Sequence, residues 1–265
     1  MNHHELSSDG IAYTVKGEGE PVVFLHGFCG SRHYFEPVAA SLEPHIKAYY
    51  IDLPGHGDSK SMQYHTLEDY VELLHKWKLE LGLEKMTLIG HSLGGYLTLA
   101  YVERYPEHVL GFGLIHSTAF PDSDEGKEGR DKAIQTIQKE GMKSFVEGLV
   151  PKLFDKSFAK THPKVVKRVL DIAYKTDDKQ AIRFLRAMRD RKDRRHIVTE
   201  DSFPQLLVAG QTDEVVPSYK TFIGDSKRAT EKVIEDAAHM SMYERPELLS
   251  CIINEWLNSL YAVHK

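Results

Sequence analysis

The sequence predicts an α/β fold, with a mostly parallel central sheet flanked by helices and a helical insertion. Three observations predict it. Short apolar runs alternate with longer segments of helical periodicity on both sides of residues 119–199, which is typical of βαβ units. Within residues 119–199, helical periodicity repeats without an intervening strand. That segment also differs in charge from the rest of the chain.

The expected elements follow in chain order. Strands are expected at residues 22–25, 48–51, 86–89, 109–115, 206–209 and 232–234, and helices at 66–81, 93–105 and 246–260. Thr66 is a plausible N-cap for the first helix, since two acidic residues follow in its first turn. Pro106 stops the second helix because proline cannot continue it.

The insertion carries apolar helical patterns at residues 133–137, 142–149, 165–170 and 182–188. Residues 119–199 contain 20 Lys and Arg against 13 Asp and Glu, so their net charge is +7, whereas the remainder has a net charge of −12. We therefore expect a core domain formed by residues 1–118 and 200–265, and a helical cap, or lid, formed by residues 119–199.

The composition excludes several classes of protein. The 265 residues contain two cysteines, Cys29 and Cys251, which cannot form a disulfide framework. A net charge of −5 lacks the basic footprint of nucleic-acid-binding proteins. No stretch reaches the roughly 18 apolar residues of a membrane span, and residues 1–10 show no signal-peptide pattern. We expect a cytoplasmic protein with no nucleic-acid partner and no membrane span; its oligomeric state is unknown from the sequence.

A serine in a G-x-S-x-G pattern is the strongest candidate for catalysis. The sequence G-H-S-L-G at residues 90–94 follows an expected strand and precedes an expected helix, and this context makes the short pattern specific. Glycine is needed at Gly90 and Gly94 because a Cβ there would collide with neighbouring backbone. The helix that follows directs its N-terminal amides toward Ser92. We predict Ser92 as a nucleophile at a strand-to-helix turn.

A serine hydroxyl requires an adjacent base, which is normally a histidine oriented by a carboxylate. Asp213 follows the strand expected at 206–209, and His239 follows the strand expected at 232–234. The order Ser92, Asp213, His239 is that of a known hydrolase class. We predict these three as a catalytic triad, with Glu214 as the nearest alternative acid and Asp236 as a more distant one.

The chain resembles the α/β-hydrolase fold superfamily, of the lidded serine esterase and enol-lactonase type, nearly end to end outside the insertion. Besides the 90–94 pattern, L-H-G-F-C-G-S at residues 25–31 is similar to the family's oxyanion loop after the third strand. D-L-P-G-H-G-D-S at residues 52–59 is similar to its loop after the fourth strand. The resemblance implies an α/β-hydrolase fold with a nucleophile elbow and a cap domain.

The resemblance also implies roles for residues of the oxyanion loop. The backbone N–H groups of Phe28 and Leu93 would form the oxyanion hole, with Gly27 supporting the loop. His26 would shape the loop without a catalytic role. We expect Cys29, beside Phe28, to pack as a small buried residue rather than to react.

The predicted function is that of a carboxylesterase-like serine hydrolase acting on a small carboxylic ester, lactone or thioester through an acyl-enzyme. No cofactor is needed, and no metal site is expected because H-E-x-x-H, H-x-H and C-x-x-C are absent from the sequence. Serine at position 92 also disfavours the dehalogenases and epoxide hydrolases of the superfamily, which use aspartate there. The alternatives are a carbon–carbon bond hydrolase or lyase acting on a keto-acid, and a non-catalytic receptor for a small ligand.

The sequence of the cap does not identify the substrate. Its positive charge could favour anionic substrates if Arg130, Arg183 or Arg186 points inward, but we interpret these arginines as solvated helix faces. Apolar cap residues could line an acyl or aromatic pocket; they are Phe145, Leu149, Leu153, Phe154 and Phe158. The adjacent His3 and His4 are expected at a mobile terminus.

Overall fold

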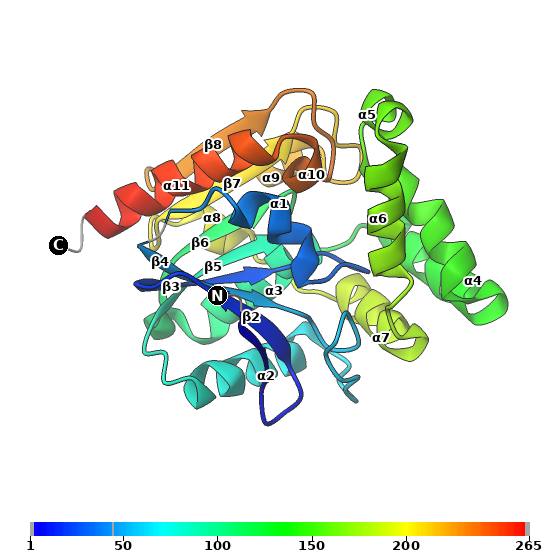
Figure 1. Ribbon diagram of the computed structural model, residues 1–265, viewed down its shortest axis with the longest axis horizontal. Coiled ribbons are helices and arrows are strands. Elements are labelled where there is room, and N and C mark those ends of the chain that lie inside the picture. The colour runs from blue at the N-terminus through cyan, green and yellow to red at the C-terminus, as the bar shows by residue number, and fades with distance from the viewer. Residues whose placement is uncertain (1–2, 44, 263–265) are drawn as a thin grey trace.

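A computed structural model of the protein describes residues 3–43 and 45–262. Its centre is an eight-stranded sheet in the order β1-β2-β4-β3-β5-β6-β7-β8 (Figure 1). The strands are β1 His3–Leu6, β2 Ala12–Lys16, β3 Glu20–Leu25, β4 Ile46–Ile51, β5 Met86–His91, β6 Val109–Ile115, β7 Gln205–Gly210 and β8 Ala229–Ile234. Strands β1, β2 and β4 pair antiparallel and every other neighbouring pair is parallel. The predicted α/β fold with a mostly parallel sheet is therefore confirmed.

The helices cover both faces of this sheet. They are α1 Glu36–Ala39, α2 Leu67–Glu80, α3 Leu93–Arg104, α4 Asp124–Leu149, α5 Lys156–Thr161, α6 Pro163–Ala173, α7 Asp178–Arg189, α8 Arg195–Thr199, α9 Ser218–Thr221, α10 Ser241–Glu244 and α11 Pro246–Ala262, with short 3-10 turns η1 Arg32–Phe35, η2 Pro106–His108 and η3 Val150–Leu153. Helices α1 and α11 pack together on one face, and α2 and α3 on the other (Figure 1). The middle strands β5 and β7 are buried along their whole length because helices cover both faces of the sheet.

The predicted start of α2 is confirmed in detail. The Thr66 hydroxyl accepts a hydrogen bond from the Asp69 amide at 3.2 Å, and the Asp69 carboxylate accepts one from the Thr66 amide at 2.9 Å. This reciprocal capping box satisfies two amides that have no partner within the helix.

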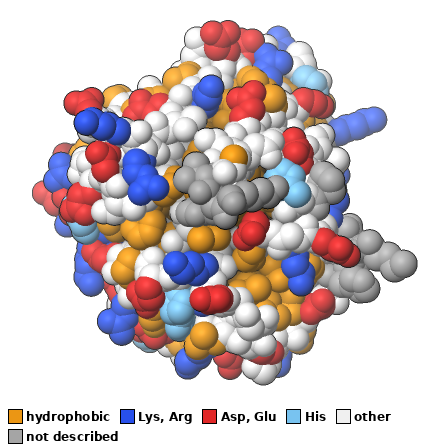
Figure 2. Space-filling view, turned by 90° about the vertical axis from the view of Figure 1, so that its left-hand side faces the viewer, with side chains coloured by type: hydrophobic (Ala, Val, Ile, Leu, Met, Phe, Trp, Pro, Cys, Tyr) orange, Lys and Arg blue, Asp and Glu red, His pale blue; other side chains and the backbone are white. Residues whose placement is uncertain are grey.

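Every element between β6 and β7 is helical, which confirms the expected helical insertion. Figure 1 shows α4 to α7 together at one end of the sheet, beyond the carboxyl ends of the parallel strands. Figure 2 shows the opposite end of the molecule, where basic and acidic side chains are intermingled. The domain limits at residues 118/119 and 199/200 stay a prediction.

The prediction for the N-terminus is wrong. His3 and His4 belong to β1, which pairs with β2, and the His4 ring lies 3.1 Å from the Asp58 carboxylate. Neither strand was predicted, since the polar sequence of β1 has no apolar run and is held through backbone pairing. The strand before Ser92 is also longer than predicted, because β5 continues to His91 instead of ending at residue 89.

Among residues 3–43 and 45–262, no helix combines the length and the apolar character needed to cross a bilayer. The cytoplasmic location expected from the sequence stays a prediction.

Candidate active site

Ser92 stands alone between the end of β5 and the start of α3. Its backbone has φ 51° and ψ −114°, a conformation that non-glycine residues rarely adopt. The turn leaves no room for side chains on its neighbours. A Cβ on Gly90 would lie 2.3 Å from the carbonyl oxygen of Gly94, and one on Gly94 would lie 2.1 Å from that of Leu25. The two glycines thus allow the sharp turn that exposes Ser92.

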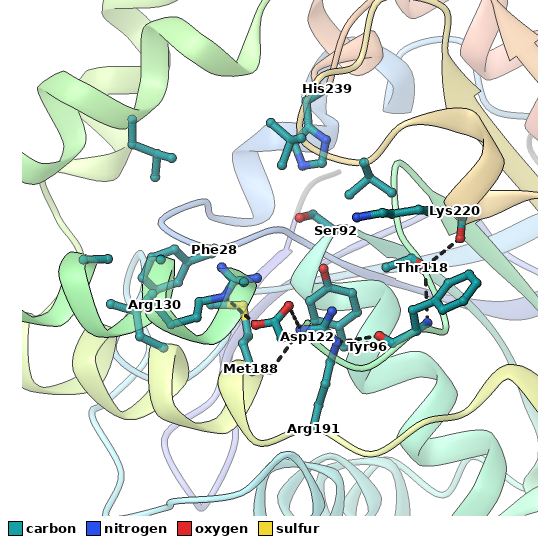
Figure 3. A pocket seen from close by; sticks show the side chains of 18 of the residues that line it. Phe28, Ser92, Tyr96, Thr118, Asp122, Arg130, Met188, Arg191, Lys220 and His239 are labelled. Atoms are coloured by element: carbon teal, nitrogen blue, oxygen red, sulfur yellow. Dashed lines mark hydrogen bonds and ion pairs between the residues drawn. The ribbon is translucent and has the colours of Figure 1, made fainter. Parts of the chain in front are cut away.

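His239 and Asp213 follow β8 and β7 and meet in the interior. The Nδ1 atom of His239 lies 2.8 Å from Oδ2 of Asp213, in hydrogen-bond geometry. The other carboxylate oxygen accepts the amides of Val215 and Val216 at 2.8 and 2.9 Å. These contacts orient the imidazole and direct its Nε2 side toward the cavity, where Figure 3 shows it beside Ser92.

The environment keeps Asp213 ionised. Burial by itself raises the pKa of this carboxyl, but the adjacent His239 and His116 lower it by more, so its pKa lies well below the usual range. A charged Asp213 favours the tautomer of His239 with a proton on Nδ1, which leaves Nε2 free to accept one.

Two further histidines, which were not among the expected site residues, surround this pair. His116, directly after β6, places Nδ1 3.2 Å from Asp213 Oδ2, a close contact without hydrogen-bond alignment, and Nε2 2.7 Å from the Ser241 hydroxyl. His91 bonds through Nε2 to the carbonyl oxygen of His239 at 2.9 Å. Burial lowers the pKa of both rings, so they are neutral. The position of His116 after a central strand was the signal that could have found it.

The side chains of His116, Asp213 and His239 also offer three potential metal ligands within 4.8 Å of one another. Metal–ligand distances of about 2.0–2.3 Å would require an ion to sit between Asp213 and His239. Such an ion would replace the hydrogen bond that orients His239.

The two expected oxyanion donors are the backbone amides of Phe28 and Leu93, which come from two different segments of the fold. Leu93 is the first residue of α3, where amides have no acceptor within the helix. Phe28 lies in the loop after β3 and lines the cavity. His26 ties this loop to the next one, with Nδ1 2.8 Å from the Gly27 carbonyl and Nε2 accepting the Leu53 amide at 2.9 Å.

The competing residues lie elsewhere. Glu214 is 79% exposed and pairs with Lys156 at 3.0 Å, and Asp236 is 77% exposed and pairs with Arg245 at 2.7 Å. Cys29 is buried, and burial raises the pKa of its thiol above the usual range, which agrees with a packing role.

The cavity beside Ser92 has a volume of about 450 Å³. Most of its lining is apolar, and the cap contributes Ala133, Phe145, Leu149, Leu153, Leu185 and Met188. Of the other expected apolar cap residues, Phe154 stacks on Phe158 with ring centroids 5.8 Å apart, and neither lines the cavity.

Of the three cap arginines considered from the sequence, Arg130 lines this cavity. Arg183 instead bonds to Gln63 at 2.7 Å, and Arg186 is exposed. Three more charged residues line the cavity, namely Asp122, Arg191 and Lys220. The cavity therefore contains charges that the sequence patterns did not reveal.

Some known proteins match the chain over nearly its whole length, and others match only part of it. The family model for the alpha/beta hydrolase fold matches residues 20–140. The 1-acylglycerol-3-phosphate O-acyltransferase ABHD5 of Homo sapiens is 35% identical over 107 residues, which are 38% of this chain and 31% of that protein. The chain thus matches about a third of the length of this curated relative.

Solved structures match from end to end. A thermophilic esterase from Thermogutta terrifontis, with malate bound, has a TM-score of 0.86 and 26% identity, and the match covers 98% of each chain. The enol-lactonase from Burkholderia xenovorans LB400 has a TM-score of 0.84 and 20% identity, covering 94% of this chain and 96% of that one, and this likeness shows the shared fold. The strand order, the partial match to the family model and these structural matches together show that the chain has the α/β-hydrolase fold.

Proposed function

We propose that this protein is a serine hydrolase that cleaves a small carboxylic ester, lactone or thioester through an acyl-enzyme on Ser92. One observation carries the proposal. The hydrogen-bonded pair of His239 and Asp213 opens on the same cavity as Ser92, which stands on a strained turn at the start of a helix. A serine, a base and a buried carboxylate in this order are the parts that acyl transfer requires.

In the first step, Ser92 Oγ attacks the carbonyl carbon of the substrate while His239 Nε2 takes the hydroxyl proton. The carbonyl oxygen becomes an oxyanion, and the amides of Phe28 and Leu93 are its proposed donors. When the tetrahedral intermediate collapses, the bond to the alcohol or thiol breaks and His239 returns the proton to the leaving group. Asp213 stays ionised and stabilises the imidazolium that forms.

In the second step, water attacks the acyl-enzyme with His239 as the base, which releases the acid and restores Ser92. The likeness to an esterase and an enol-lactonase supports this chemistry. The mainly apolar cavity of about 450 Å³ supports a small substrate.

A carbon–carbon bond hydrolase that acts on a keto-acid is the second candidate. That reaction requires a group that binds the acid, and Arg130 lines the cavity. The two candidates differ in whether simple esters are turned over.

The test is labelling by an alkyl fluorophosphonate, measured by intact mass, with hydrolysis of p-nitrophenyl acetate, butyrate and octanoate alongside. We expect one adduct on the wild type and none on Ser92→Ala, which should lose at least about 10³-fold in kcat because the nucleophile is absent. Ser202→Ala, which changes an exposed serine outside the cavity, is the control and should label like the wild type.

An adduct on Ser92→Ala would show that another residue is the nucleophile. Absence of both label and ester turnover in the folded wild type would contradict serine hydrolysis and favour a receptor or a lyase.

A further inference from the structure

The charged residues that line the cavity beside Ser92 do not balance. Arg130, Arg191 and Lys220 are basic, and Asp122 is the acidic residue among the lining residues outside the catalytic pair. Asp122 is shared by two arginines, with Oδ2 3.0 Å from Arg130 Nε and Oδ1 2.6 Å from Arg191 Nη1. The single carboxylate of Asp122 thus faces the guanidinium groups of Arg130 and Arg191, so this group of three residues has a net charge of +1.

Arg191 has a structural role. It is 5% exposed, and besides Asp122 it donates from Nε to the Phe120 carbonyl at 3.0 Å and from Nη1 to the Met188 carbonyl at 2.8 Å. Its guanidinium also lies 4.2 Å from the centre of the Tyr96 ring. These contacts use Nε and Nη1 of Arg191 within the protein and hold Asp122 in place.

Arg130, on helix α4, is bound much less completely. Its side chain is 26% exposed, and its hydrogen bond within residues 3–43 and 45–262 is the one from Nε to Asp122. Figure 3 shows the guanidinium beside Asp122 in the cavity that Ser92 and His239 also border. The Tyr96 side chain is also near this guanidinium, but no aligned hydrogen bond joins the two, so the terminal nitrogens of Arg130 can bind a ligand in this cavity.

The surroundings keep Arg130 charged. Burial lowers the pKa of its guanidinium, but the nearby Tyr96 and Asp122 raise it by more. A fixed positive charge with two free donors, set among apolar side chains, is stabilised most by an anion that accepts both donors, and a carboxylate matches this fork.

We propose that Arg130 binds a carboxylate group of the substrate, so that the protein prefers esters, lactones or thioesters that carry a second, ionised acid group. This inference rests on the proposed function, since it assumes that the reacting carbonyl lies at Ser92. Asp122 acts as the support that aims Arg130, and Arg191 fixes Asp122 in turn. Lys220, whose side chain Figure 3 shows near Ser92, adds to the positive potential of the cavity.

The inference is specific to Arg130 rather than to the positive charge of the cap as a whole. Arg183 has the same charge and lies on the same helical insertion, but its contact is with Gln63 outside the cavity. Replacing Arg183 therefore changes the net charge by the same amount without touching the proposed site.

The test compares pairs of esters that differ only in charge. Ethyl hydrogen glutarate is compared with ethyl 5-oxohexanoate, which has a methyl ketone in place of the carboxylate, and the succinate and adipate homologues are included. A second pair, 4-acetoxybutanoate and 5-acetoxypentan-2-one, places the carboxylate on the alcohol side. The measured quantity is kcat/KM for each ester, and the ratio within each pair gives the preference for charge.

We expect the wild type to prefer the charged member in at least one pair. Arg130→Gln should lower that ratio by about 10- to 100-fold, since a charge-assisted pair of hydrogen bonds is lost. Arg130→Lys should lower it less, because lysine keeps the charge without the fork. Arg183→Gln should leave the ratio as in the wild type.

The inference is overturned if the wild type prefers the uncharged member of both pairs, or if Arg130→Gln lowers kcat/KM equally for both members of a pair. It is also overturned if Arg183→Gln has the same effect as Arg130→Gln. Hydrolysis of p-nitrophenyl butyrate that is lost in Ser92→Ala tests the proposed function separately, so either idea can fail without the other.

Discussion

Backbone strain is concentrated at the candidate site. Among residues 3–43 and 45–262, four non-glycine residues have a positive φ; Cys29, Ser92 and His116 lie at the site, and Asp236 lies at the surface. Cys29 lies next to the proposed oxyanion donor Phe28, and His116 contacts Asp213. Such backbone conformations each cost about 1–3 kcal/mol and persist where the surrounding structure enforces them. The strain at Cys29, Ser92 and His116 therefore lies where side chains and backbone amides must hold fixed positions around the candidate site.

At the scale of a single residue, Asp213→Asn tests the assigned acid. The amide should keep the contacts with the Val215 and Val216 backbone, but it favours the wrong tautomer of His239, so kcat should fall by about 10⁴-fold. Steady-state kinetics with p-nitrophenyl butyrate measures this. Glu214→Gln is the matched control and should change kcat less than about threefold, because Glu214 pairs with Lys156 at the surface. A near-normal rate for Asp213→Asn would assign the acid elsewhere.

At the scale of an element, small residues in the first turn of helix α3 allow it to pack closely against neighbouring backbone. Gly94 touches the backbone of Leu25 at the end of β3, and a Cβ on Gly95 would lie 2.2 Å from the Ser117 hydroxyl. The helix is buried over nearly its whole length, so it cannot move outward to make room. The start of α3 is thus pressed against the loops after β3 and β6, which holds its amides next to Ser92.

The surroundings of Gly90 in β5 and of Gly148 in α4 predict opposite effects for substitution by alanine. Gly90→Ala should lower the free energy of unfolding by more than about 3 kcal/mol, since its Cβ would meet the backbone of Gly94 at 2.3 Å. Gly148→Ala, in helix α4 with nothing within 4 Å of the added Cβ, should raise it by about 0.5–1 kcal/mol because alanine favours helix. Urea unfolding measures both. A stable, active Gly90→Ala protein would contradict the packing argument.

At the scale of the whole molecule, the parallel sheet assembles the site. The loops after β3, β5, β7 and β8 all leave the same edge, because the carboxyl ends of parallel strands lie together. The helical insertion then covers this edge and supplies part of the cavity lining. The loops are held by buried neutral histidines, among them His26 and His56.

Those buried histidines predict how stability depends on pH. Burial lowers the pKa of His26 to about 4 and that of His56 to about 3, from an ordinary value of 6.5. Below pH 6.5 these two histidines bind protons in the unfolded chain but not in the folded protein. The free energy of unfolding is therefore highest above pH 6.5 and decreases as the pH is lowered. At pH 5 the loss is about 2 kcal/mol for each of the two histidines.

Urea unfolding at pH 7 and pH 5 measures this loss. His56→Gln, which removes one of the two groups, should show a smaller difference between the two pH values than the wild type. A free energy of unfolding that is the same at pH 7 and pH 5 would contradict the argument.

The sequence by itself determined the α/β fold, the helical insertion and the residues expected to carry the chemistry. Apolar periodicity, the capping box at Thr66 and the G-x-S-x-G pattern at residues 90–94 are local signals. Each depends on residues that are close together in the sequence. Ser92, Asp213 and His239 could be selected from the sequence because they follow β5, β7 and β8, and the carboxyl ends of parallel strands lie at the same edge of the sheet.

Only the tertiary structure decided what no local signal encodes. Strand β1 is held by pairing with β2, so its polar sequence showed no apolar run. His116 meets Asp213 from another strand end, and Arg130 is turned inward while Arg183 is not. These outcomes depend on contacts between segments far apart in the chain, and the direction of a cap side chain is set by the packing of the helix that carries it rather than by its neighbours in sequence.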